Sequence, residues 1–281
     1  MTLKRFTIVV IGLTLVSGAL SCRQSTPESA GSHLAPTQAQ VAPGAESPEA
    51  EVDFEHGNRQ VTQMLADRPA MAEFVTRENV RCKINSQADI WKWAAEAYGK
   101  KVNGGCIEWD DADLDKPSHY MADHTIPYQG KNGLIRVRER FEPRNGHARE
   151  LTFEELWSSC IFELYNIQSA DAFLDIYRRS LTGQISRDQW VRTNTQIEHN
   201  ALLRLVTFYE LEWKQWADEN DFASDPAKWR CDTPKNYDEW INLYRTGSSN
   251  PYLYWENYYD KQIVPYLEQL GLSGKPELDT R

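Results

Sequence analysis

Two glutamates stand in helical stretches where a charge is unusual. Glu163 is the single charged residue of WSSCIFELYN, residues 157–166. On a helical wheel, Glu198 lies in the middle of an apolar arc, seven residues from both Val191 and Leu205. A carboxylate is costly to bury, so such positions indicate a buried ion pair or a site for acid–base or metal chemistry. Glu198 is equally well explained by a structural arginine or amide partner. Glu163, on the flank of its apolar face, is typical of a boundary residue.

The arrangement of these helices resembles a known class of enzyme. The order of the expected elements is similar to that of gluzincin-type zinc metallopeptidases: a helix, two strands, the Glu163 helix and a later helix with Glu198. In that family a His-Glu-x-x-His helix holds zinc and activates its water, and a later glutamate completes the ligands. Overlaid here over residues 88–215, the motif has Phe162 and Asn166 where the histidines should be. The resemblance therefore implies a degenerate scaffold that binds rather than cuts, with Glu163 a vestigial base and Glu198 and Asn166 as binding residues.

Two alternatives stay open beside this binding module. An active metal-dependent hydrolase would draw unusual ligands for a divalent metal from Glu163, Glu198 and His119 or His124, although no histidine pair has a tight ligand spacing and we expect no metal. A saccharide or peptidoglycan binder would use the aromatic C-terminal third, where Trp240 and Trp255 stand. Core packing explains these aromatic residues as well. The chain has neither a glycine-rich phosphate loop nor a Gly-x-Ser-x-Gly turn.

Capping and turn signals define the elements that must position these residues. Thr152 with Glu155, and Ser186 with Gln189, form capping boxes that predict helix starts. The segment GLIRVRERF, 133–141, alternates apolar residues with arginines and predicts a strand, which the zinc-peptidase resemblance makes the edge along which a peptide lies. Two further helices are expected over 61–75 and 87–101, and a short strand at CIEWDD. Two more helices are expected, one from Thr233-Pro234 and one from Asn250-Pro251 to Leu270, which Pro265 should kink or shorten. We expect an α+β fold that is mostly α-helical with a small antiparallel or mixed sheet.

The first residues indicate export. Lys4 and Arg5 precede an apolar run over 6–16 that is too short for an ordinary membrane-spanning helix. The run GALSC, ending at Cys22, resembles the lipobox of bacterial lipoproteins, which implies a lipid on Cys22 and a membrane anchor in the bacterial cell envelope. Arg23 stands where retention in the inner membrane of some bacteria uses Asp, which favours the outer membrane by resemblance. The expected divisions are a signal peptide at 1–21, a lipidated cysteine and disordered Pro/Ala/Ser-rich tether at 22–52, one globular domain at 53–272 and a flexible tail at 273–281.

Charge and cysteines narrow the classes of partner. The net charge is −10, and about −12 once the leader's two basic residues are removed, which argues against nucleic acid as a partner. The expected partners are the membrane, through the lipid, and a peptide or cell-wall ligand. In an oxidising compartment one or two disulfides among the remaining cysteines are plausible, with the pairing open. These cysteines are Cys82, Cys106, Cys160 and Cys231.

Overall fold

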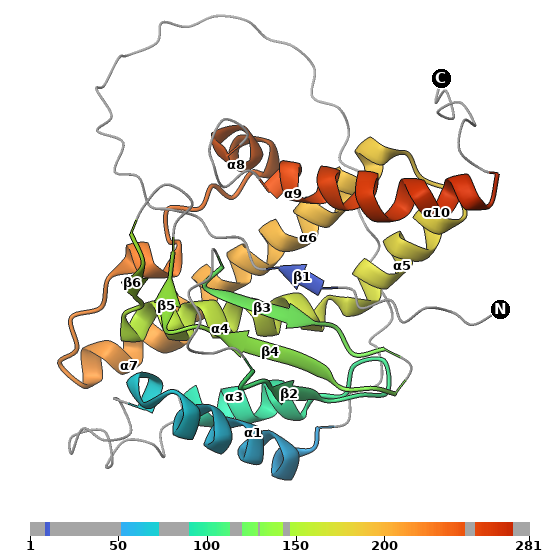
Figure 1. The fold of residues 1–281 in the computed structure, drawn as a ribbon. Coiled ribbons are helices and arrows are strands. Elements are labelled where there is room, and N and C mark those ends of the chain that lie inside the picture. The colour runs from blue at the N-terminus through green and yellow to red at the C-terminus, as the bar shows by residue number, and fades with distance from the viewer. Residues whose placement is uncertain are drawn as a thin grey trace, which may run out of the picture.

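The computed structural model is an α+β structure, mostly helical, as the sequence predicts (Figure 1). It describes residues 9–11, 52–72, 90–112, 120–128, 130–142, 147–244 and 251–271. The helices are α1 (Phe54–Asp67), η1 (Pro69–Ala72), α3 (Ile90–Gly99), α4 (Phe153–Gln168), α5 (Ala170–Leu181), α6 (Arg187–Phe208), η2 (Tyr209–Trp213), α7 (Lys214–Glu219), η3 (Pro226–Trp229), α8 (Tyr237–Tyr244), α9 (Pro251–Tyr258), η4 (Tyr259–Ile263) and α10 (Val264–Gln269). Within this part of the chain, no helix is both long and apolar enough to cross a membrane.

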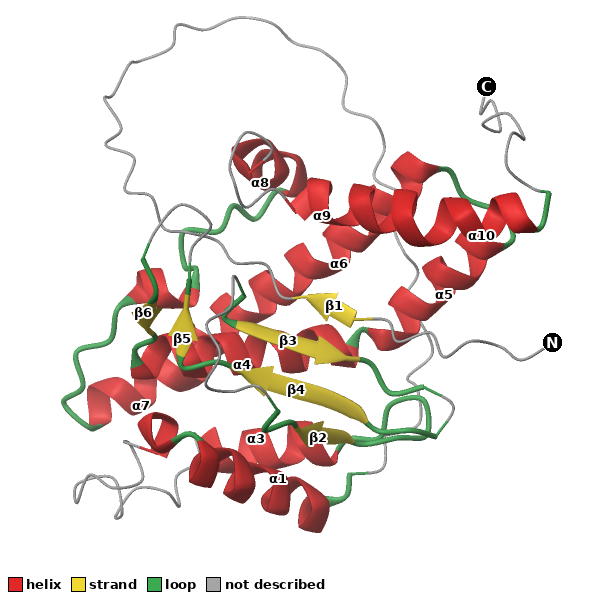
Figure 2. Ribbon diagram, in the orientation of Figure 1, coloured by secondary structure: helices red, strands yellow, loops and turns green. Residues whose placement is uncertain are grey.

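The main sheet is mixed and lies against α4 (Figure 2). Its central strand β4 (Gly133–Val137) pairs in parallel with β2 (Ile107–Trp109) and antiparallel with β3 (Ala122–Thr125). β1 (Val9–Ile11) adds to the outer side of β3, also antiparallel, which gives the order β1-β3-β4-β2. The prediction that the 133–141 strand forms the sheet edge is therefore wrong, because β4 lies between β3 and β2. A second small sheet pairs β5 (Arg140–Phe141) with β6 (Arg149–Glu150).

The alternation of the β4 segment is confirmed. Ile135 and Val137 point into the core and are fully buried. On the other face, Arg136 pairs with Asp110, and Arg138 donates to Asp123 Oδ2 at 2.9 Å. Two of the arginines therefore form ion pairs with neighbouring acids, rather than a row open to a ligand.

α4 is the central helix of the molecule. It begins with the predicted capping box, in which Thr152 Oγ1 accepts from Glu155 N and the Glu155 carboxylate accepts from Thr152 N. The sheet, α3, α6 and η3 all contact α4, and every residue from Phe153 to Ile167 is buried. A helix enclosed on all sides has no solvated flank, so the interpretation of Glu163 as a boundary residue is wrong.

α6 begins at its own capping box, formed by Ser186 and Gln189 as the sequence predicts. It continues through η2, a single π-helical turn over Tyr209–Trp213, into α7 and ends at Glu219. A second π-helical turn, η4, interrupts the last helix just before Pro265, where the sequence predicts a kink. Both turns keep the helix continuous while shifting its face.

The boundaries of two helices differ from those predicted from the sequence. The first helix begins earlier than expected, at Phe54, where the Asp53 side chain caps the His56 N–H. It ends before Pro69, where a 3₁₀ turn replaces the predicted continuation. The helix expected from Thr233-Pro234 begins at Tyr237.

Candidate functional site

The Glu163 carboxylate forms a buried pair with a histidine from the sheet. Glu163 Oε2 lies 2.5 Å from His124 Nδ1, and both side chains are at most 1% exposed. A contact this short between an acid and an imidazole requires a proton between the two atoms. Burial raises the pKa of Glu163, and the His124 hydrogen bond works against that rise. The two side chains are therefore joined by a short hydrogen bond, with one proton between the carboxylate and the imidazole.

Glu198 lies where the helical wheel places it, in the buried centre of the α6 face. Its side chain is 1% exposed, and Trp255 Nε1 of α9 donates to Oε1 at 3.1 Å. The second oxygen, Oε2, has no hydrogen-bond partner among the described residues. Burial raises the pKa of Glu198 well above its ordinary value, and the charge of nearby Glu163 raises it further. Both effects favour the protonated form of the Glu198 carboxyl.

Asn166 completes the group that we call the buried polar cluster: His124, Glu163, Asn166 and Glu198. Asn166 is fully buried one turn after Glu163 on α4, and its proximity lowers the pKa of that carboxyl. Neither Nδ2 nor Oδ1 of Asn166 makes a hydrogen bond of good geometry with the described residues. His124 Nε2 also makes none with them. Buried polar atoms are rarely left without hydrogen bonds, so the cluster is an unusual polar environment.

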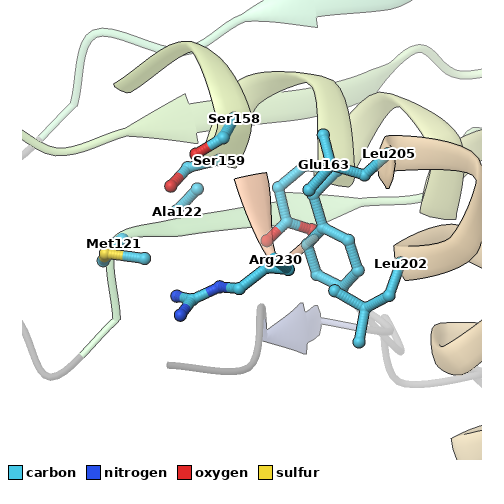
Figure 3. Close-up of a pocket in the computed structure, with 9 residues that line it drawn as sticks. Met121, Ala122, Ser158, Ser159, Glu163, Leu202, Leu205 and Arg230 are labelled. Atoms are coloured by element: carbon cyan, nitrogen blue, oxygen red, sulfur yellow. The ribbon is translucent and has the colours of Figure 1, made fainter. Parts of the chain in front are cut away.

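A small pocket opens beside the cluster (Figure 3). Its volume is about 30 Å³, the share of one water molecule. Side chains from β3, α4, α6 and the turn after η3 line it, among them Ala122, Ser159, Glu163, Leu202 and Arg230. The pocket has room for a water molecule or the tip of one side chain, but it is too small for a substrate.

The chemistry open to this arrangement is proton sharing. Where the structure is described, no group of three His, Cys, Asp or Glu side chains is placed to hold a metal ion. His199, the neighbour of Glu198, contacts Pro234 O through Nε2 at 2.8 Å, and burial lowers its pKa. His119 lies outside the described residues. The chemistry that the cluster offers is therefore the sharing and transfer of protons between His124, Glu163 and Glu198.

The structure brings together three of the residues singled out from the sequence, Glu163, Asn166 and Glu198. Two others were missed: His124 as the partner of Glu163, and Trp255 as the donor to Glu198. The alternation of Ala122-Asp123-His124-Thr125 carries a signal for the first, because period two places His124 on the same inward face as Ala122. For the second no local signal exists, since 57 residues separate the partners.

The C-terminal tryptophans are core residues. Trp240 is 0% exposed and Trp255 is 2% exposed. Trp255 stacks on Phe173 and meets Trp190 edge-on, with ring centroids 5.8 and 6.0 Å apart. Neither ring is open to stack on a sugar.

The cysteines do not form two disulfides. Cys160 and Cys231 are free thiols. Cys160 is fully buried beside Tyr98 and Met64, and burial raises its pKa to about 12. The alternative in which all four cysteines form two disulfides is therefore wrong, because two of them are free thiols. Cys82 and the lipidation candidate Cys22 lie outside the described residues.

Comparison of the chain with protein-family models, curated proteins and solved structures finds no match in any of the three. What the protein does must therefore be argued from its own residues.

Proposed function

We propose that this protein is anchored by a lipid in the bacterial cell envelope, and that its α-rich domain binds an extended peptide segment without cutting it. The residue after the anchor, Arg23, favours the outer membrane by resemblance. The segment would add as a strand to the outer edge of β3. The observation that carries this proposal is the antiparallel pairing of β1 with β3.

The edge of β3 is suited to strand addition. Val10 lies opposite His124, with Val9 and Ile11 opposite Thr125 and Asp123. Backbone hydrogen bonds give such a pairing its affinity, and pockets for alternate side chains give it specificity. If the chain is cleaved before Cys22, β1 leaves with the leader, and β3 then offers a free edge to another segment.

The buried polar cluster supports binding rather than catalysis. A general base must reach the proton that it abstracts, but the Glu163 carboxylate is enclosed and already bonded to His124. Glu198, the residue that the zinc-peptidase resemblance makes a metal ligand, accepts a hydrogen bond from Trp255, and burial raises its pKa and so favours the protonated form. A protonated carboxyl is a poor ligand for a metal.

The anchor is proposed from the sequence alone, on the lipobox-like run that ends at Cys22. Mass spectrometry of the protein from bacterial membranes should find Cys22 as the first residue, carrying acyl chains. A mature chain that begins elsewhere, or carries an unmodified Cys22, would refute the anchor and leave the proposal on peptide binding untouched.

Strand addition can be tested with the chain's own β1 segment. The probe is a fluorescent peptide of residues 7–13 with lysines added for solubility, and the protein is the chain from residue 22 with Cys22→Ser. Fluorescence anisotropy should show saturable binding to this chain. The full chain, in which β1 already covers the edge, should bind the peptide much more weakly.

The matched control peptide carries an N-methyl group at Val10, which removes a backbone donor while keeping the side chain. We expect at least one of two such peptides, methylated at Val10 or at Val9, to lose binding, because alternate residues of a strand face the ladder. If both methylated peptides bind as well as the parent, the contact is not strand addition.

Metal analysis addresses the hydrolase alternative. We expect the purified chain to hold no stoichiometric divalent ion and to leave the bound peptide intact. A stoichiometric ion that disappears in Glu198→Ala would overturn the non-catalytic proposal.

A further inference from the structure

A second and larger cavity lies between α3, α4 and α6, away from the edge of β3. Its volume is about 320 Å³, at the lower end of the range for small-molecule sites. That volume has room for a ligand built on a single substituted ring.

One wall of the cavity is aromatic and held firmly. Trp93 is partly buried, with its ring 5.4 Å from that of Tyr165 and 4.8 Å from that of Phe208, centroid to centroid. Because these contacts fix the ring of Trp93, ordering it on binding costs little. Its remaining surface lines the cavity and offers a flat apolar platform.

Two cationic side chains, Arg204 and Lys100, also line the cavity. The Arg204 guanidinium lies over the ring of Tyr165, 4.0 Å from its centroid, and one of its N–H groups donates to Gln168 Oε1. Its other N–H groups, and the Lys100 ammonium, make no hydrogen bond or ion pair with the described residues. A guanidinium fixed in this way presents a fork of donors that matches a carboxylate.

One acidic side chain, Glu96, shares the lining with these two cations. The three charges sum to +1, so the site suits a monoanion. A carboxylate accepts hydrogen bonds only, and Glu96 would therefore bind ligand hydroxyls.

We infer that this cavity binds a ring acid of the uronate type: a six-membered hydroxylated ring that carries one carboxylate. The carboxylate bonds Arg204 and Lys100, hydroxyls bond Glu96, and the less polar face of the ring lies on Trp93. This assignment does not depend on the peptide-binding function, because the two sites share none of the residues that carry the arguments.

Isothermal titration of the full chain in detergent with D-glucuronate tests the inference. Glucuronate should bind, with D-glucose and benzoate each at least about tenfold weaker, since one lacks the charge and the other the hydroxyls. Arg204→Gln should weaken glucuronate binding by about tenfold to a hundredfold, as the loss of a charged hydrogen bond does. Arg204 and Thr207 are exposed, so substitutions there leave the core intact.

Two further variants keep the test decisive. Thr207→Trp fills the cavity and should abolish binding, whereas Arg178→Gln, the same change of charge at an exposed position on α5, should leave the affinity unchanged. Circular dichroism checks that each variant is folded. No binding of glucuronate, equal affinity for glucose or benzoate, or unchanged affinity in Thr207→Trp would each overturn the assignment.

Discussion

Glu198 should make the protein less stable as the pH rises, and replacing it with glutamine should remove that dependence. In the folded chain, burial and the charge of Glu163 hold the pKa of Glu198 well above its ordinary value of 4.5. In the unfolded chain the carboxyl ionises near that ordinary value. Between the two pKa values the folded state binds one more proton than the unfolded state, so the free energy of unfolding falls as pH increases.

The size of the effect follows from linkage. Each pH unit in this window costs about 1.4 kcal/mol for one such proton. From pH 5 to pH 7 the unmodified chain should therefore lose about 2.7 kcal/mol relative to Glu198→Gln. The contribution is fully present below the unfolded pKa and is lost upward through the window, the direction for an acid whose folded pKa is raised.

Urea unfolding at pH 5, 6 and 7, followed by circular dichroism, measures this difference. Other titrating groups cancel between the two chains, so the separation of the curves isolates Glu198. Glu210→Gln, an exposed glutamate just beyond α6, is the matched control and should run parallel to the unmodified chain. If the Glu198→Gln curve also runs parallel, Glu198 ionises in the folded state as it does in the unfolded chain, and the raised pKa of Glu198 is refuted.

Three further predictions concern the buried polar and thiol groups. His124→Leu should lower the free energy of unfolding by about 3–5 kcal/mol, because Glu163 is left buried without its partner; urea unfolding should show the double variant with Glu163→Leu to be more stable than His124→Leu alone. Glu154→Ala should cost a similar amount, since its carboxylate accepts from Trp213, Trp229, Ser224 and the Asp225 N–H, and Glu154→Gln should cost less in the same assay. Cys160 should resist thiol reagents until the chain unfolds, because it is buried and its pKa is about 12; a reaction at the rate of an exposed thiol under native conditions would contradict this.

Local signals predicted the elements of this fold well. Both capping boxes form as the sequence indicates, since each depends on residues three positions apart. The alternation of β4 and the helix irregularity just before Pro265 are local in the same sense. The position of Glu198 was predictable because a single apolar face is visible on a helical wheel.

Long-range contacts decided what the sequence could not show. The environment of Glu163 depends on His124, which lies 39 residues earlier in another element. A wheel assumes one buried face, but α4 is enclosed on all sides, so its flank is buried as deeply as its centre. The place of β4 in the middle of the sheet depends on where β3 pairs. The alternation of residues within one strand does not predict the order of strands in the sheet.

The π-helical turn η2 makes the helix that begins at Arg187 sensitive to length. A π turn holds one residue more than an α turn, so it corresponds to a single-residue insertion that the helix has absorbed. Deleting one residue within Tyr209–Trp213 would restore regular α-helix and rotate everything beyond it by about 100°. Trp216 and Ala217, both buried, would then turn out of the core. Relatives of this chain that lack the insertion must therefore have rebuilt the packing of α7, and sequence alignments through this region should place their gap there.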